Sequence, residues 1–86
     1  MSGTDYTDVK ERILGLNNLI KDKVAIGYTR VMASIPVSDR NEAEYVFNYY
    51  TDAGYEVELH DFTTEYLIRL DSPIPESVIN KFKSGD

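Results

Sequence analysis

The period of the hydrophobic pattern changes after Gly27, and this change limits the folds open to the chain. Before it, apolar residues recur every three or four positions, which indicates one face of an α-helix. These residues are Val9, Ile13, Leu16, Ile20 and Val24. After it, apolar and polar side chains alternate from Tyr28 to Val37, as they do in a strand with one buried side. The pattern therefore predicts a fold that packs helices against strands.

The first helix is expected to span about residues 4–26. Gly27 suits the left-handed residue that ends a helix, because glycine has no Cβ to clash in that conformation. Leu19 and Ile26 are expected to widen the buried face of this helix. Gly15 weakens its middle, where we expect the helix to bend or break.

A second helix and a second strand follow. Ser38 or Asp39 caps the helix, because either side chain can accept a hydrogen bond from a free backbone N–H group. Gly54 ends the helix. Alternating apolar and polar side chains then predict a half-exposed strand over residues 55–60.

The remaining segment predicts a third strand and a short helix. The strand covers residues 65–70, and the Asp-Ser-Pro sequence at residues 71–73 is expected to break it. Pro75 suits the first position of the last helix, where its missing N–H group is tolerated.

The resulting order is α-β-α-β-β-α, an α+β fold in a single domain over residues 1–86. The third strand is the most apolar, so we expect it at the centre of a three-stranded sheet of order 1-3-2. The outer strands would be parallel, joined by a right-handed crossover through the second helix, with helices mainly on one face. A chain this short buries only about 60% of its unfolded surface, so we also expect a homodimer or higher oligomer.

Composition argues against several classes of function. The chain has no cysteine and only one histidine, His60, so it lacks a disulfide framework and an obvious Ser-His-Asp or Cys-His device. No glycine cluster precedes a helix, as a phosphate-binding loop requires. We therefore expect no enzymatic activity, no metal and no cofactor. The chain begins with a polar, acidic segment and has no apolar run near the ~20 residues that span a bilayer, which predicts a soluble, cytoplasmic protein.

The net charge of −6 is concentrated in the middle of the chain. Residues 39–71 hold nine acidic and two basic residues, while the rest of the chain carries a net charge of +1. An acidic field repels phosphate backbones and anionic lipids and attracts basic proteins. We therefore expect no direct binding to nucleic acid or membrane, and a basic protein as the partner.

The first candidate binding surface combines acidic side chains with two tyrosines one helical turn apart. Its residues are Glu42, Glu44, Tyr45, Tyr49, Asp52, Glu56 and Glu58. The acidic residues of the helix and the strand are expected to adjoin, because Gly54 turns the chain directly from one into the other. Aromatic rings among polar groups are enriched at interfaces. The alternative is that these rings fold over the sheet edge with their hydroxyls in water.

The second candidate surface consists of Tyr28, Arg30 and Arg69, on strand faces opposite the core. If helices cover only one face of the sheet, these residues are exposed beside Met32 and Leu67. Such a surface suits a second copy of the chain, or a flat, nucleotide-like ligand held by arginine and stacked on tyrosine. If the first or last helix crosses this face, the surface is buried instead.

The remaining polar groups have two interpretations. Glu56, Glu58 and Asp61 could bind a divalent cation or act as an acid pair, and His60 could act as a base or a pH switch. Their places on a solvent-facing strand side and at a hairpin turn favour simple solvated charges.

A helix that ends at Gly27, a strand and a capped helix lead into Asp52-Ala53-Gly54-Tyr55-Glu56-Val57-Glu58 and then Tyr66-Leu67-Ile68-Arg69. This succession, over about residues 10–70, resembles small, acidic, uncharacterised proteins of tailed bacteriophages. Many such proteins bind host or defence components, and others are virion parts. The resemblance implies a binding function, with the host cytoplasm as its location.

Three hypotheses of function follow. The leading one is a non-enzymatic, acidic protein-binding module, such as a phage accessory protein or anti-defence inhibitor that binds a basic host surface. The second is a protein that binds or sequesters a nucleotide-like molecule at an oligomer interface lined by Tyr28, Arg30 and Arg69. The third is a structural assembly subunit.

Overall fold

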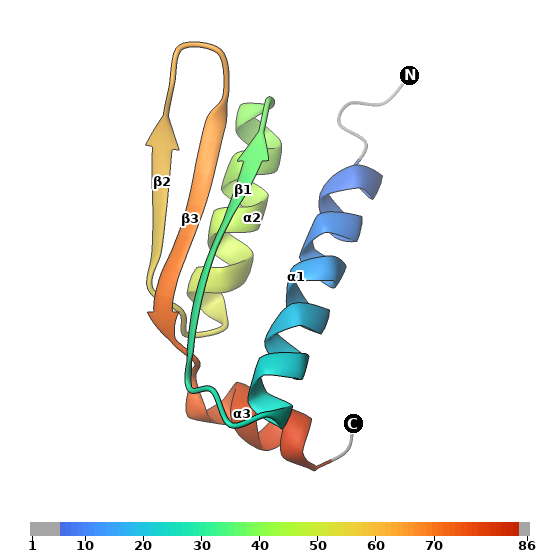
Figure 1. Cartoon of the computed structure of the whole chain (residues 1–86). Helices are drawn as coiled ribbons and strands as arrows, with labels where there is room; N and C mark the ends of the chain where they lie inside the picture. The colour runs from blue at the N-terminus through green and yellow to red at the C-terminus, as the bar shows by residue number, and fades with distance from the viewer. Residues whose placement is uncertain (1–5, 85–86) are drawn as a thin grey trace.

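A computed structural model describes residues 6–84 and has the expected order of elements (Figure 1). The helices are α1 (Thr7–Ala25), α2 (Arg40–Asp52) and α3 (Glu76–Lys83). The strands are β1 (Arg30–Val37), β2 (Val57–Asp61) and β3 (Tyr66–Pro73). The first two residues of the expected first helix, Thr4 and Asp5, lie outside the described residues.

The three strands form one sheet of order β1-β3-β2, as predicted. Because β3 runs antiparallel to both neighbours, β1 and β2 are parallel to each other. Pro36 lies in β1, an edge strand, where a residue without an N–H group interrupts no ladder on its open side.

The prediction that residues 71–73 break the third strand is wrong, because β3 continues to Pro73, which pairs with Arg30. The side chain of Ser72 explains how a polar residue can continue this strand into the core. Ser72 is completely buried, and its hydroxyl accepts a hydrogen bond from the Glu56 N–H group at 2.9 Å. The same hydroxyl donates to the Pro73 carbonyl at 2.7 Å.

Helix α1 buries the predicted stripe and continues without interruption through Gly15. The buried residues are Val9, Ile13, Leu16, Ile20 and Val24. Leu19 and Ile26 do not widen this face, since they are 43% and 71% exposed. The prediction that these two residues are buried is wrong, because the buried side chains of α1 are confined to the stripe from Val9 to Val24.

Two glycines end the first two helices as expected. Gly27 and Gly54 have φ angles of 98° and 104°, in the left-handed region that glycine adopts at low cost. Beyond Gly54, the Tyr55 N–H group donates to the Tyr50 carbonyl at 3.0 Å, which closes the end of α2. At the other end of α2, Asp39 is the cap, and its carboxylate accepts from the Glu42 N–H group at 3.0 Å.

The helices cover one face of the sheet, as predicted. Alternate residues of a strand point to opposite faces, and the buried ones in β1 and β3 include Val31, Ile35, Ile68 and Leu70. In Figure 1, α2 lies behind the sheet, α1 runs beside β1, and α3 crosses below the lower end of the sheet. We call the opposite side the open face. Its residues are Arg30, Met32, Ser34, Pro36, Glu58, His60, Leu67, Arg69, Asp71 and Pro73.

Candidate functional site: the open face of the sheet

The two tyrosines of the first candidate surface pack against α1. Tyr45 is half-buried, and its ring centroid lies 5.0 Å from that of Tyr6, just before α1. Tyr49 is 41% exposed, and its hydroxyl accepts a hydrogen bond from the Asn17 amide at 2.9 Å. Both rings therefore help to join the two helices, and only the second presents a substantial free surface.

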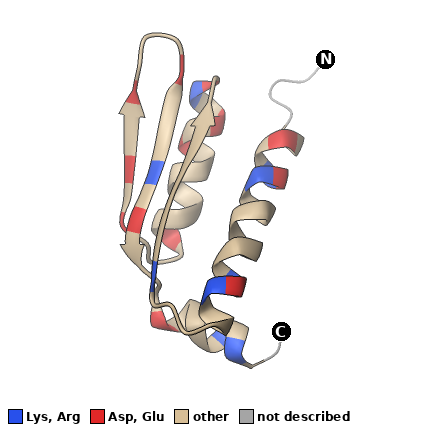
Figure 2. Ribbon diagram, in the orientation of Figure 1, with Lys and Arg blue, Asp and Glu red and all other residues tan. Residues whose placement is uncertain are grey.

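The acidic residues of the first candidate surface do not come together. Glu44 pairs with Arg40 on α2 at 3.2 Å, and Asp52 lies at the far end of that helix. Glu58 belongs to the open face, whereas α2 covers the opposite face of the sheet (Figure 2). The expected adjoining surface therefore does not form, because the strand turns its acidic side chains away from the helix that precedes it.

The strand register sets the neighbours on the open face. Arg69 of β3 lies directly between Ser34 of β1 and Glu58 of β2. One row further toward α3, Asp71 lies beside Met32. Because directly opposite residues share a face of the sheet, charges of both signs lie next to exposed apolar side chains.

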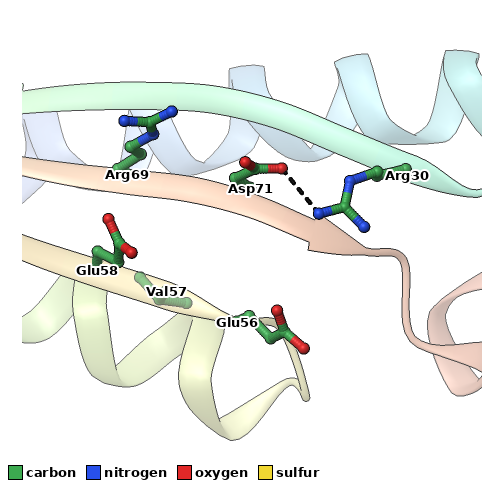
Figure 3. A pocket seen from close by; sticks show the side chains of 6 residues that line it. All are labelled: Arg30, Glu56, Val57, Glu58, Arg69 and Asp71. Carbon is green, nitrogen blue, oxygen red and sulfur yellow. Dashed lines mark hydrogen bonds and ion pairs between the residues drawn. The ribbon is translucent and has the colours of Figure 1, made fainter.

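A depression of about 560 Å³ lies on this face (Figure 3). It is lined by Arg30, Glu56, Val57, Glu58, Arg69 and Asp71. The guanidinium of Arg30 bonds to the Asp71 carboxylate at 3.0 Å. Two guanidinium groups and three carboxylates therefore line one shallow site, with one ion pair already formed.

Two more depressions continue the site across β1. The first, of about 300 Å³, is lined by Met32, Ala33, Ser34, Leu67, Arg69 and Leu70. The second, of about 330 Å³, is lined by Lys23, Tyr28, Arg30 and Met32. Because Arg69, Arg30 and Met32 are shared between depressions, the three form one continuous surface. The residues of the second candidate surface, Tyr28, Arg30 and Arg69, are thus brought together, and none of the three helices within residues 6–84 covers them.

Sequence reasoning missed two contributors to this surface. Asp71 was expected in a strand-breaking turn, although the alternation of buried and exposed residues continues through it. Lys23 was part of the first helix in the sequence pattern, and the turn at Gly27 that ends this helix brings its ammonium group to 5.0 Å from the centre of the Tyr28 ring. In this turn the Tyr28 N–H group donates to the Lys23 carbonyl at 2.9 Å. Gly27, which the sequence marks as the end of the helix, was the signal that could have found this contact.

The single histidine lies at the other end of the open face. His60 Nε2 is 3.0 Å from Glu58 Oε1, and the imidazole stacks on Phe62 with ring centroids 6.2 Å apart. Across residues 6–84, no three His, Asp or Glu side chains are grouped so that they could hold a metal ion. Within the same range, no helix has the length and apolar character needed to cross a membrane.

No protein-family model, curated protein or solved structure matches this chain.

Proposed function

We propose that the chain is a non-enzymatic protein-binding module that acts through the open face of its sheet. The observation that carries this proposal is the side-chain content of a sheet face that no helix of the described part of the chain covers. Met32 is 66% exposed and Tyr28 is 54% exposed, and both lie beside Arg30. Methionine, tyrosine and arginine are the residues that protein interfaces favour over the rest of a surface.

The charges favour a protein partner over a small anion. A nucleotide-like ligand on Arg30 and Arg69 would meet the carboxylates of Glu56 and Glu58 in the same depression, and Asp71 already binds Arg30. Like charges placed in contact cost several kcal/mol. A protein surface that presents both acidic and basic side chains satisfies both signs of charge on this face, so we take it as the partner.

Site-specific photo-cross-linking in the cell that produces the protein tests this function. A photoreactive amino acid at Met32 is compared with the same amino acid at Leu14, which is 61% exposed on α1 and outside the open face. We expect discrete protein adducts from position 32 and none of them from position 14. The proposal fails if position 32 yields no protein adduct, or if both positions yield the same adducts.

A further inference from the structure

The open face carries unpaired charges of both signs. Neither the Arg69 guanidinium nor the Glu56 carboxylate forms an ion pair with any residue in the range 6–84. The carboxylates of Glu56 and Glu58 lie along the β2 side of the face, and Arg30 lies at the β1 side. A face with acidic residues on one side and basic residues on the other is complementary to a second copy that faces it, when the acidic side of each copy meets the basic side of the other.

We propose that the open face binds the open face of a second copy, related by a two-fold axis that runs parallel to β3. This inference rests on the proposed function and names its partner. Such an axis places β2 of each copy over β1 of the other, because it exchanges the two edges of a sheet centred on β3. Every contact between two different residues in a two-fold interface occurs twice, so each favourable charge pair stabilises the dimer at two places.

The register aligns the charges that this axis brings together. Glu58, Arg69 and Ser34 lie at the same height along the strands. In Figure 3 the Arg69 side chain reaches across β1, away from Glu58 of its own chain, and it also lines the depression beside Ser34. A second copy would bring its Glu58 over Ser34 and therefore to the Arg69 guanidinium. Glu56 of the second copy would lie in the next row along the strands, closer to Arg30.

The size of the face predicts a weak dimer. Strands about 4.8 Å apart with a rise of ~3.3 Å per residue give the three strands, of eight, five and eight residues, a flat footprint of roughly 330 Å². Standard protein interfaces bury about 800 Å² on each partner. With Met32 and Tyr28 as its apolar part, the dimer is expected to form at high protein concentration and to weaken with salt, because exposed ion pairs are screened.

Sedimentation velocity of the full chain over a range of concentrations tests this arrangement. Arg69→Glu and Glu58→Arg each place like charges across the axis, and each should weaken dimerisation at least about tenfold. An equimolar mixture of the two variants should regain the dimer. In the mixed dimer the introduced glutamate meets the introduced arginine, and the native Arg69 of one copy meets the native Glu58 of the other. Lys10→Glu, a charge reversal on the exposed side of α1, should leave dimerisation unchanged.

The inference is overturned if the unaltered chain remains a monomer at all concentrations, if neither reversal weakens the dimer, or if the mixture does not regain it. Far-UV circular dichroism of each variant confirms that the exposed substitutions leave the fold intact. A monomer that still cross-links through position 32 to a different protein would overturn the second copy as partner and leave the proposed function standing. Absence of adducts at position 32 would overturn the function itself.

Discussion

Ser72 shows how one side chain connects two segments that are distant in sequence. It lies in β3 with no exposed surface, and its hydroxyl accepts from the Glu56 N–H group just before β2 begins. This bond fixes the entry of the chain into β2 against β3, beside the depression that Glu56 lines. The bond is part-buried, and an intramolecular hydrogen bond of this kind stabilises a fold by about 0.5–1.5 kcal/mol.

Replacement of Ser72 by alanine should lower the free energy of unfolding by about 0.5–1.5 kcal/mol, the net contribution of a typical intramolecular hydrogen bond. Urea denaturation measures this change. The control is Ser77→Ala, at an exposed position on α3, for which a change within about 0.5 kcal/mol is expected. Equal effects of the two substitutions would show that the Ser72 hydroxyl contributes nothing specific to stability.

At the scale of elements, Gly54 and Gly15 have different effects on their helices, because one lies at a helix end and the other in a helix middle. Gly54 ends α2 with a φ of 104°, and a Cβ there would lie 3.2 Å from the Pro75 ring. Gly15 lies in the middle of α1 and is exposed, and a Cβ there would meet no atom within 4 Å. The helix therefore continues through Gly15 at an intrinsic cost that neighbouring turns and the buried stripe offset.

Gly15→Ala should raise the free energy of unfolding by about 0.5–1 kcal/mol, because alanine loses less backbone entropy in a helix. Gly54→Ala should lower it by about 1–2 kcal/mol or more, since it imposes a left-handed conformation and a close contact with Pro75. Thermal and urea denaturation of both variants give the comparison. A lower free energy of unfolding in Gly15→Ala would contradict this prediction, because a Cβ at this position meets no atom within 4 Å.

At the scale of the whole molecule, a group of tyrosines joins α1, α2 and the turn that precedes β2. Tyr50 of α2 is fully buried, and its hydroxyl lies 3.3 Å from the Ile13 carbonyl of α1. Its ring contacts Tyr49 and Tyr55 edge to face, with centroids 4.9 and 5.5 Å away. Burial, with a smaller effect from Tyr49, raises the pKa of Tyr55 to about 12 and raises that of Tyr50 further.

These shifts predict that the fold loses stability at alkaline pH. Above about pH 10 the unfolded chain loses its tyrosine protons while the folded chain keeps those of Tyr50 and Tyr55. The unfolded state then binds fewer protons, so the free energy of unfolding falls as pH rises from about 10 toward 12. Circular dichroism with urea at each pH, together with tyrosinate absorbance, measures this fall.

Two variants separate these tyrosines from other groups that titrate in the same range. Tyr50→Phe should flatten the alkaline fall in unfolding free energy, because it removes a group whose pKa differs between the folded and unfolded states. Tyr28→Phe, at a 54% exposed position, should leave the slope unchanged. The same slope in Tyr50→Phe as in the unaltered chain would contradict this assignment.

Periodicity along the sequence determined most of the elements and the order of the strands. The stripe from Val9 to Val24, the cap at Asp39 and the glycines at 27 and 54 are local signals, because each depends on side-chain spacing or on a single backbone conformation. The apolar third strand indicated the centre of the sheet for a similar reason, since a central strand buries more side chain than an edge.

Tertiary structure decided which of the two candidate surfaces forms and which further side chains join it. Sequence proximity suggested that the acids of α2 and β2 adjoin, but a strand's alternation sends Glu58 to the face that α2 does not cover. The run of residues 71–73 looked like a strand break, yet the pairing of Arg30 with Pro73 and the Ser72 hydroxyl extend β3 and bring Asp71 to Arg30. Local pattern specifies elements because it depends on near neighbours in the chain, whereas a surface depends on the register between segments some forty residues apart.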